Sequence, residues 1–389
     1  MTRVLIEIPG ELRWDAAAVK EFSENAPYYL ADVRLIAIEG RTVTLEGQSD
    51  QVSDNLRRQV ESLALTISKN LRDAREQLLF EHLTPPSAQP DPMPALLASD
   101  TVIRTGRARF VFRGEMFQVL EGLDRMLLGH AREVAAEPQS YPATVHARTL
   151  MQSGYLKAFP QHAFFVAPAA RSATSLHEIG ACTETSDLDR ARGAPLFGSH
   201  DQVLAPTVCY HCFEAMQGRE LESSRCFTAV NHCHRSEVLA EGALDRLECF
   251  RMREVIGFGD EAFVNGLLDA CLERTREVLT RWGIAHHGIT ATDPFFAGAA
   301  GSKLFFQSTF ALKRELRVRI DFDGRWLSVA SFNNHQQSLT RAFQIRGANF
   351  PLSSGCVGWG YERIVYALMS QLGTDVSAWP RSVRDDLGV

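Results

Sequence analysis

The chain has no long hydrophobic run. Nowhere in its 389 residues does an apolar stretch approach the ~20 residues that a membrane-spanning helix needs. The N-terminus, MTRVLIEIPGELRWD, has an apolar run that is too short for a secretion signal, and no small-residue cleavage site follows it. We therefore expect a cytoplasmic protein with no membrane partner.

The sequence also lacks a surplus of positive charge. It has 41 Lys and Arg residues against 47 Asp and Glu residues, which gives a net charge of −6. Proteins that bind nucleic acid usually carry a basic surplus. The balance argues against a large RNA partner, although a local basic patch is compatible with it.

Cysteine is scarce, and the 8 cysteines are expected to remain unpaired. In a cytoplasmic chain cysteines serve more often as thiols or metal ligands than as disulfides. The sequence has them at Cys182, Cys209, Cys212, Cys226, Cys233, Cys249, Cys271 and Cys356.

Prolines gather in one polar tract, TPPSAQPDPMP. Such a tract neither continues a helix nor pairs as a central strand, so residues 86–99 are predicted to be a linker. Residues 1–85 then form a small α/β module of unknown role. It has short strand-like runs followed by one long helix over Asp50–His82, where apolar residues recur at helical spacing.

The order of elements in residues 100–389 predicts an α+β fold. An amphipathic helix over Phe110–Ala136 comes first, followed by mostly antiparallel strands. A helix over Leu267–Trp282 interrupts the strands, and a closing helix lies within Gly355–Leu372. This order differs from the βαβ alternation of a parallel sheet.

The segment Phe227–Gly259 is typical of an antiparallel strand pair. Alternate residues on a strand share a face. That rule groups three polar residues on the first strand with an aromatic ring and carboxylates on the second. A guanidinium, carboxylates and a flat ring suit a nucleotide, although a solvated face with an ion pair is the commoner use of such residues. The residues are Cys233, Arg235 and Glu237, then Glu248, Phe250, Met252 and Glu254.

Three further segments carry candidate chemistry. CYHC at Cys209–Cys212 is predicted to lie in a strand, and SFNNH at Ser331–His335 at a strand end. SSGCVGWGYERIVYAL, at Ser353–Leu368, has glycines that allow close backbone approach. Arg363 falls in the first turn of the helix that follows, where it is placed to reach a phosphate.

These segments resemble, in order, the three signatures of class II aminoacyl-tRNA synthetases. Phe110–Pro142 is similar to signature one, the long dimer helix, which implies a homodimer. CHRSE at Cys233–Glu237, continuing to Glu254, is similar to signature two, with His234 in the place of its aromatic residue. GWGYER at Gly358–Arg363 matches signature three. The resemblance covers residues 105–389 and is to the seryl branch.

One departure narrows the resemblance. Bacterial seryl enzymes have Thr-x-Glu where this chain reads Thr207-Val-Cys209. Methanogen-type seryl-tRNA synthetases, and the truncated amino acid:[carrier protein] ligases similar to them, use a Cys-Glu-Cys zinc site. The resemblance maps those ligands onto Cys209, Glu254 and Cys356. Three protein ligands leave one tetrahedral position open, as a substrate-binding zinc requires.

Two alternatives for the metal remain open. Cys209 and Cys212 with Cys226, Cys233 or nearby histidines would form a closed four-ligand structural site. Residues three apart on a strand point to opposite faces, which disfavours that site. The other alternative is that the chain holds no metal.

The resemblance also implies an ATP site. Arg235 would bind the α-phosphate and the substrate carboxylate, Glu237 would contact the adenine side, and Phe250 would stack on adenine with Arg363 on its other face. Phe250 has an alternative place in the core. The implied ATP site consists of Arg235, Glu237, Arg246, Leu247, Phe250, Ser328, Val329, Ala330, Ser331 and Arg363.

The strand Ser328–Ser331 would line the pocket for ATP and Mg²⁺. The carboxylate that usually binds Mg²⁺ there is Ser328 in this sequence. Glu315 is expected to supply part of the missing charge; its alternative is a surface ion pair with Lys313 or Arg317.

The resemblance implies ATP-dependent activation of a small amino acid, glycine or alanine before serine, with transfer to the phosphopantetheine thiol of a carrier protein. The segments Asp293–Phe296 and Asp375–Asp385 look like those ligases. Transfer to tRNA by a zinc-dependent seryl-tRNA synthetase is the alternative, and the helix at 50–82 would then be a remnant RNA-binding arm. A synthetase-like scaffold without activity is the third hypothesis.

Overall fold

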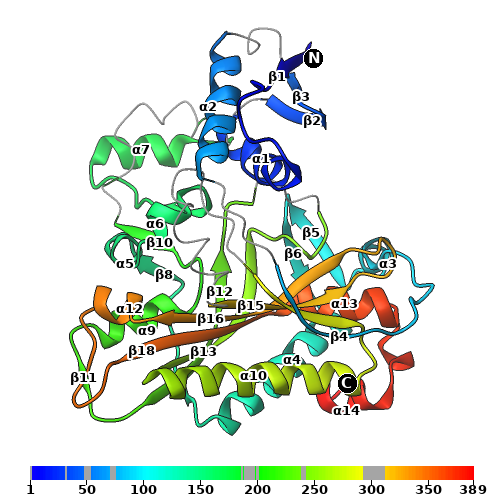
Figure 1. Ribbon diagram of the computed structural model, residues 1–389, viewed down its shortest axis with the longest axis vertical. Helices are drawn as coiled ribbons and strands as arrows, with labels where there is room; N and C mark the ends of the chain where they lie inside the picture. The colour runs from blue at the N-terminus through cyan, green and yellow to red at the C-terminus, as the bar shows by residue number, and fades with distance from the viewer. Residues whose placement is uncertain are drawn as a thin grey trace.

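The fold is seen in a computed structural model (Figure 1). It describes residues 2–30, 33–47, 54–70, 76–184, 187, 198, 201–237, 242–291 and 312–389. A small N-terminal module stands above a large, mostly antiparallel sheet that has helices packed on it (Figure 1). The predicted α+β class is confirmed.

The N-terminal module is a three-stranded antiparallel sheet, in the order β1-β3-β2, with two helices. Asp15 caps the first helix by accepting a hydrogen bond from the Ala18 N–H at 3.0 Å. Phe22, Val43 and Leu63 are buried between helices and sheet, so the module has its own hydrophobic core. Its elements are β1 (Thr2–Glu7), α1 (Ala16–Tyr29), β2 (Val33–Glu39), β3 (Thr42–Gly47) and α2 (Asp54–Asn70).

The predicted helix over Asp50–His82 is too long. The structure describes α2 over Asp54–Asn70, and β4 (Leu78–His82) pairs with β14 (His286–Thr290) at the edge of the large sheet. The last apolar residue at helical spacing is Leu71, so nothing periodic supported the extension. The Phe80 ring covers Gly288, where an added Cβ would lie 2.3 Å from it.

Residues 86–99 are not a free linker. They contain α3 (Pro92–Ala98), whose N-terminus is capped by Asp91 at 3.0 Å from the Met93 nitrogen. Met93 and Leu96 are buried in the main core. Prolines at the first turn of a helix are well tolerated, which is why a proline-rich tract contains a helix here.

The large sheet has the strand order β4-β14-β15-β16-β18-β13-β12-β7. All neighbours are antiparallel except β7 and β12. Its remaining strands are β7 (Glu137–Pro138), β12 (Arg225–His234), β13 (Cys249–Gly259), β15 (Lys313–Arg319), β16 (Trp326–Gln336) and β18 (Ser353–Gly360). The predicted strand pair is therefore confirmed as β12 and β13.

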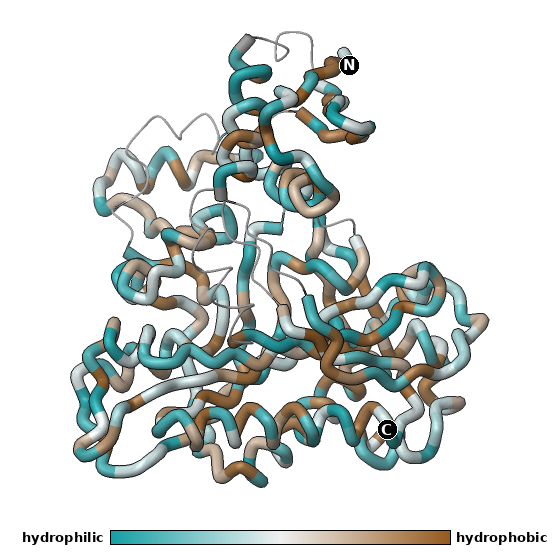
Figure 2. Tube along the Cα trace, viewed as in Figure 1, coloured by the Kyte–Doolittle hydropathy of each residue, from teal (hydrophilic) through white to brown (hydrophobic). Residues whose placement is uncertain are grey.

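Helices cover one face of this sheet and bury the main core. They are α4 (Gly114–Glu133), α10 (Glu261–Arg281), α13 (Tyr361–Leu372) and α14 (Arg381–Leu387). Hydrophobic stretches run along α10 and the strands behind it (Figure 2). The helix predicted over Phe110–Ala136 is α4, which begins later than predicted, at Gly114, because Phe110 belongs to strand β6. No helix among the described residues is long and apolar enough to cross a membrane.

Smaller elements surround the sheet. Strands β5 (Val102–Gly106) and β6 (Arg109–Phe112) form a short antiparallel pair. Strands β11 (Glu220–Leu221) and β17 (Arg346–Gly347) form a short parallel pair. A third small sheet has the order β8-β10-β9. The bounds are β8 (Thr144–His146), β9 (Phe165–Val166), β10 (Gln202–Leu204), α5 (Ala147–Gln152), α6 (Tyr155–Ala158), η1 (Pro160–His162), α7 (Ala173–Ala181), α9 (Cys209–Met216), α12 (Ser338–Ala342) and η3 (Val376–Ala378).

Candidate metal and nucleotide site

One face of the large sheet, here called the site face, gathers the predicted polar residues. Cross-strand partners lie on the same face of an antiparallel sheet. Glu254 on β13 lies opposite Gly358 on β18, Gly358 opposite Ser331 on β16, and Ser331 opposite Glu315 on β15. Cys356 is two residues before Gly358, so it faces the same way.

Gly358 keeps the floor of the site face open between Glu254 and Ser331. A Cβ there would lie 3.2 Å from Met252 Sδ, 3.5 Å from Glu254 Cγ and 3.6 Å from Ser331 Oγ. Any larger side chain would fill the space that the two polar groups border. The glycine of signature three is therefore needed for space rather than for an unusual backbone angle.

Cys209 lies in a different element from the one predicted. It is the first residue of helix α9, not part of a strand. The chain leaves β10 at Leu204 and turns over the site face, and Val208 is the N-cap of the helix. The argument that Cys209 and Cys212 point to opposite faces of a strand, and so cannot share a metal, is therefore wrong. Residues three apart lie on the same face of a helix.

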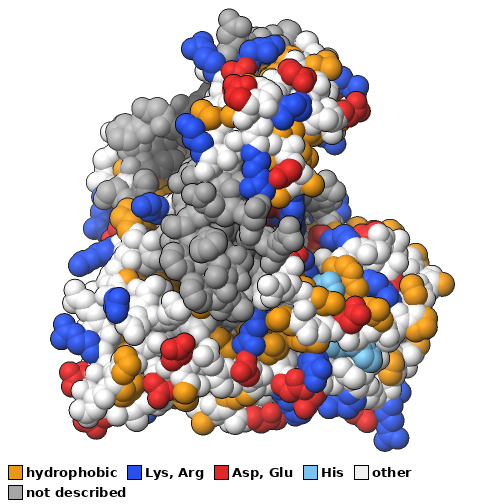
Figure 3. Space-filling model, in the orientation of Figure 1, with side chains coloured by type: hydrophobic (Ala, Val, Ile, Leu, Met, Phe, Trp, Pro, Cys, Tyr) orange, Lys and Arg blue, Asp and Glu red, His pale blue; other side chains and the backbone are white. Residues whose placement is uncertain are grey.

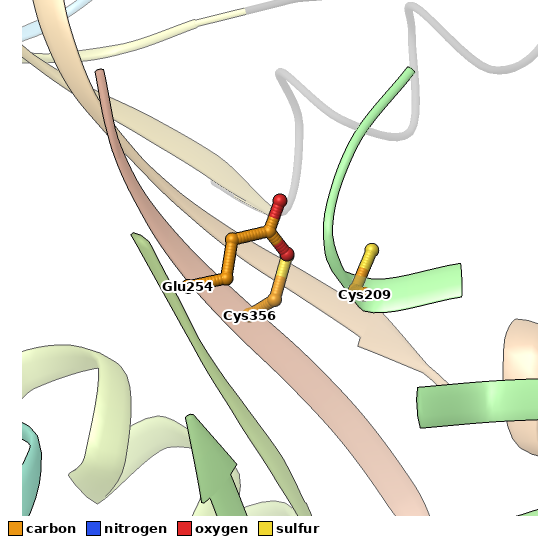
Figure 4. A group of neighbouring side chains, drawn as sticks. All are labelled: Cys209, Glu254 and Cys356. Carbon is orange, nitrogen blue, oxygen red and sulfur yellow. The ribbon is translucent and has the colours of Figure 1, made fainter. Parts of the chain in front are cut away.

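The structure brings the predicted metal ligands together. One donor atom each of Cys209, Glu254 and Cys356 lies within 4.8 Å of the others, and all three residues are buried. Glu254 and Cys356 come from neighbouring strands, and Cys209 faces them from α9 (Figure 4). In tetrahedral zinc, bonds of ~2.3 Å to sulfur and ~2.0 Å to oxygen place such donors roughly 3.5–3.8 Å apart. Among the described residues this is the one such group, and Cys212 is outside it.

Glu254 has an oxygen that no described residue satisfies. Its Oε1 accepts hydrogen bonds from the Thr207 hydroxyl and from the Val208 N–H at 3.2 Å. Its Oε2 is buried without a hydrogen-bond partner. Burial and the neighbouring Cys356 sulfur raise the pKa of Glu254 to about 7. A buried, unpaired carboxylate oxygen beside two thiols is the donor set that a zinc ion fits.

The Cys209 and Cys356 sulfurs lie within 4.8 Å of each other, and they shift each other's pKa. Cys209 donates to Cys356, which together with the adjacent His335 lowers the pKa of Cys356. The same hydrogen bond and burial raise the pKa of Cys209. Zinc binds the thiolate form of cysteine, so the lowered pKa of Cys356 favours its service as a ligand, whereas Cys209 would have to release its proton on binding.

Two residues of the predicted SFNNH segment support Cys356. The Asn333 Nδ2 lies 3.6 Å from the Cys356 sulfur, and the His335 Nε2 lies 3.5 Å from it. Sequence reasoning singled out the segment without assigning these roles. The signal was present, because Ser331, Asn333 and His335 alternate along β16 and so fall on one face.

Arg235 lies just beyond the end of β12. Its Nε donates to the Pro206 carbonyl at 3.0 Å, and its Cζ lies 5.2 Å from the centre of the Phe250 ring. Phe250 is half-buried at the edge of the main core. Arg235 thus lies over the ring on which adenine is predicted to stack, and the stacking of adenine between Phe250 and Arg363 stays a prediction.

Arg363 and Glu237 lie near the loop before β13. Arg363 donates from Nε to the Asp245 carbonyl at 2.6 Å and from Nη1 to the Ser328 carbonyl at 3.3 Å. Burial lowers the pKa of Arg363. Glu237 is buried, and its Oε2 lies 3.5 Å from the Arg246 Nη1. Arg363 therefore donates to backbone carbonyls, and Arg246 pairs with the Glu237 carboxylate.

Three predicted ATP-site residues, Leu247, Val329 and Ala330, have side chains in the main core. Only their backbone can face a nucleotide. Glu315 is not a surface residue: 13% of its side chain is exposed, and it pairs with Lys313 and Arg317, each at 3.1 Å. Burial opposes ionisation of Glu315, but these two cations outweigh it and lower its pKa.

Glu362 has a role that sequence reasoning missed. Its two carboxylate oxygens accept from the Arg251 N–H, each at 3.0 Å. The ladder between β13 and β18 ends at Met252 and Gly360, so Glu362 continues it by one side chain. Its place beside Arg363 in GWGYER gave no sign of this contact, because spacing along the chain does not show which backbone group a side chain reaches. The predicted segment Asp293–Phe296 lies outside the described residues.

Comparison with known proteins identifies the family. No protein-family model matches the chain. An amino acid–[acyl-carrier-protein] ligase of Bradyrhizobium diazoefficiens is 31% identical over 278 residues, which is 70% of this chain and 82% of that protein. The chain belongs to the amino acid–[acyl-carrier-protein] ligase family. The prediction of a ligase is thereby confirmed.

More distant relatives of this ligase are seryl-tRNA synthetases. The type-2 serine–tRNA ligase of Methanopyrus kandleri is 23% identical over 295 residues, 72% of this chain and 56% of that protein. The solved structure of M. kandleri SerRS in complex with A. aeolicus tRNASec has a TM-score of 0.73 at 20% identity, over 99% of this chain and 77% of that one. The predicted class II synthetase fold of the seryl branch is confirmed.

Proposed function

We propose that this ligase activates a small amino acid with ATP and transfers it to the phosphopantetheine thiol of a carrier protein. The observation that carries the proposal is the Cys209, Glu254 and Cys356 group in a chain 31% identical to an amino acid–[acyl-carrier-protein] ligase. Glycine or alanine is the proposed substrate, ahead of serine.

The proposed reaction has two steps. In the first, a carboxylate oxygen of the amino acid attacks the α-phosphorus of ATP, and the bond to pyrophosphate breaks. In the second, the carrier thiol attacks the acyl carbon, AMP leaves, and the thiol proton is released. No enzyme nucleophile is needed, because positioning and charge stabilisation carry both steps.

Cys209, Glu254 and Cys356 would hold zinc, which when bound supplies a Lewis acid for the neutral α-amino group of the substrate. The protein residues do the rest. The Thr207 hydroxyl and Val208 N–H fix one oxygen of Glu254, which leaves Oε2 for the metal. Asn333 and His335 orient the Cys356 sulfur, as outer groups do in metal sites.

The nucleotide lies, in this proposal, beside Phe250, with Arg235 neutralising the charge that develops at the α-phosphate. Arg235 reaches that position from the space above the Phe250 ring. Mg²⁺ would accompany ATP. Because Glu315 is already paired with Lys313 and Arg317, the chain offers Mg²⁺ the hydroxyls of Ser328 and Ser331 rather than a free carboxylate.

The deciding experiment has two parts. ATP–pyrophosphate exchange across the amino acids, with metal analysis of the same sample, should show exchange with glycine or alanine and about one zinc per chain. Radiolabelled amino acid is then offered to holo carrier protein and to bulk tRNA. Label on the carrier protein alone is expected. Background exchange with every amino acid would support the inactive scaffold instead.

A tRNA acceptor is the second candidate. It is favoured by the likeness to a tRNA-bound synthetase structure over 99% of this chain, which includes the N-terminal module. Against it, acidic and basic side chains intermix on that module in the face shown (Figure 3). Label on tRNA and not on carrier protein would establish this candidate and overturn the first.

We also propose that the protein is a homodimer formed through α4 and the strand before it. Phe117 on α4 is 50% exposed and Val111 on β6 is 47% exposed, and both lie in the segment that resembles the dimer helix of signature one. Light scattering should give the dimer mass for the parent, and Phe117→Glu should shift the mass towards the monomer. Leu176→Glu, at another exposed apolar residue, is the matched control and should remain dimeric.

A further inference from the structure

The segment His234–Glu237, here called the nucleotide arm, is held from several directions. The His234 N–H donates to Ala205 O at 2.8 Å, and the Arg235 N–H donates to Glu248 O at 3.0 Å. On the far side, Arg107 Nη2 donates to Glu237 O at 2.8 Å. The arm carries both Arg235 and Glu237, so its backbone position decides where these side chains reach.

The residue between them, Ser236, is bound by a single partner. Its N–H donates to the backbone carbonyl of His162 at 3.1 Å. Its own carbonyl lies 3.2 Å from the His162 Nδ1, and a carbonyl only accepts, so that nitrogen carries the proton. His162 ends the short helix η1 and is half-buried. Both backbone polar groups of Ser236 are thus paired with one histidine.

His162 also contacts the N-terminal module. The Tyr28 ring, on α1, packs edge-to-face on the His162 ring with centroids 5.6 Å apart and an interplanar angle of 78°. This geometry is the favoured arrangement of aromatic pairs. Tyr28 therefore contacts the residue, His162, whose hydrogen bonds fix Ser236.

We propose that the N-terminal module holds the nucleotide arm in its binding conformation through Tyr28 and His162. His162 is then a positioning residue for ATP, acting through Ser236, and the module has a role in substrate binding. The inference rests on the proposed function for its consequence, namely the affinity for ATP. The mechanical link itself is independent of the reaction.

The hydrogen bond from His162 is tested first. His162→Leu fills the site but cannot donate, whereas His162→Asn places an amide N–H near the Nδ1 position. His162→Leu should raise the KM for ATP about fivefold, the size expected for one lost hydrogen bond. His162→Asn should restore most of that loss. The KM for the amino acid and the metal content should stay at the parental values, which a general loss of structure would not allow.

The link to the module is tested with a matched pair. Tyr28→Ala removes the ring and should raise the KM for ATP about threefold, within the range for an aromatic pair, while Tyr28→Phe should not. Trp14→Ala removes a comparable edge-to-face contact, with Phe22 at 5.2 Å inside the module, and should leave the KM for ATP unchanged. Equal effects of Tyr28→Ala and Trp14→Ala would overturn the inference.

Hydrogen exchange separates the two proposals. The peptide that contains the nucleotide arm should exchange faster in Tyr28→Ala than in the parent or in Trp14→Ala. Faster exchange with unchanged ATP affinity would reject the role of His162 and leave the proposed function standing. A parent that binds no ATP would reject the proposed function and with it the role in ATP binding, while the exchange rates would still decide whether the module holds the arm. Unchanged exchange in Tyr28→Ala would overturn the inference.

Discussion

The two ends of the site face differ in how their charges are satisfied. At the metal end, Glu254 Oε2 is buried with no described partner, and two thiols lie beside it. At the nucleotide end, Arg235 and Arg363 already rest on the carbonyls of Pro206, Asp245 and Ser328. A cation would therefore bind at the metal end without displacing a hydrogen bond of Glu254 Oε2, whereas phosphates must displace existing hydrogen bonds at the nucleotide end. We expect zinc to bind a preformed site and ATP to bind with rearrangement of side chains.

Removing a metal ligand should have the largest effect. Cys209→Ala should lose zinc and reduce exchange activity about a thousandfold, because a Lewis acid supplies several kcal/mol of charge stabilisation. ATP affinity, measured by calorimetry, should fall much less, since the two ends are built from different residues. Cys212→Ala, one turn further along α9, is the control and should keep its zinc. A full zinc content in Cys209→Ala would refute the ligand assignment.

The reverse experiment breaks the nucleotide end. Arg235→Ala should lower kcat/KM for ATP about a hundredfold, the size typical of a lost group that stabilises transition-state charge. Its zinc content should remain parental. Arg276→Ala, at an exposed ion pair on α10, should change neither quantity. Loss of zinc in Arg235→Ala would show that the two ends are not separate.

A third prediction concerns Glu362, whose carboxylate accepts from the Arg251 N–H where the ladder between β13 and β18 ends. Burial raises its pKa from 4.5 to about 7, so between these values the folded state holds a proton that the unfolded state has released. Stability from this group is therefore lost as pH rises through that window. Gln does not ionise, so the free energy of unfolding of Glu362→Gln relative to the parent should rise by about 3 kcal/mol from pH 4.5 to pH 8.

The measurement is urea unfolding of both proteins at several pH values. Glu277→Gln, at a half-exposed pair on α10, serves as the control and should show no such trend. A constant difference between Glu362→Gln and the parent across this range would contradict the assignment.

The smallest effect is expected at the support of Cys356. His335→Ala should weaken zinc binding about tenfold, as loss of an outer group commonly does, measured by competition with a chelator. ATP affinity should be unaffected. His232→Ala, an exposed histidine on β12, should behave like the parent. Unchanged zinc affinity would mean that His335 packs against the site without tuning it.

Much of the catalytic half was accessible from sequence because alternation fixes which side chains share a face. It correctly paired β12 with β13 and placed Glu254 with Phe250 and Met252 on one side. The register with β18, which brings Cys356 to Glu254, involves strands far apart in the chain. Only the resemblance to a known family suggested that contact.

The misses have physical causes. CYHCF lacks a helix-length apolar pattern, and α9 is only 8 residues long, so its helical form follows from packing of Phe213 and Cys212 against the sheet. β4 is a strand because it pairs with β14. A carboxylate that completes a backbone ladder, as Glu362 does, has no signature in sequence spacing.

Strand β18 continues without interruption into helix α13. Cys356 is on the strand and Arg363 is in the first turn of the helix, so one stiff unit contributes to both ends of the site face. A displacement of this unit by either ligand changes the geometry offered to the other. Amino acid and ATP would then bind cooperatively, and whatever factor one gains from the other must be the same in both directions.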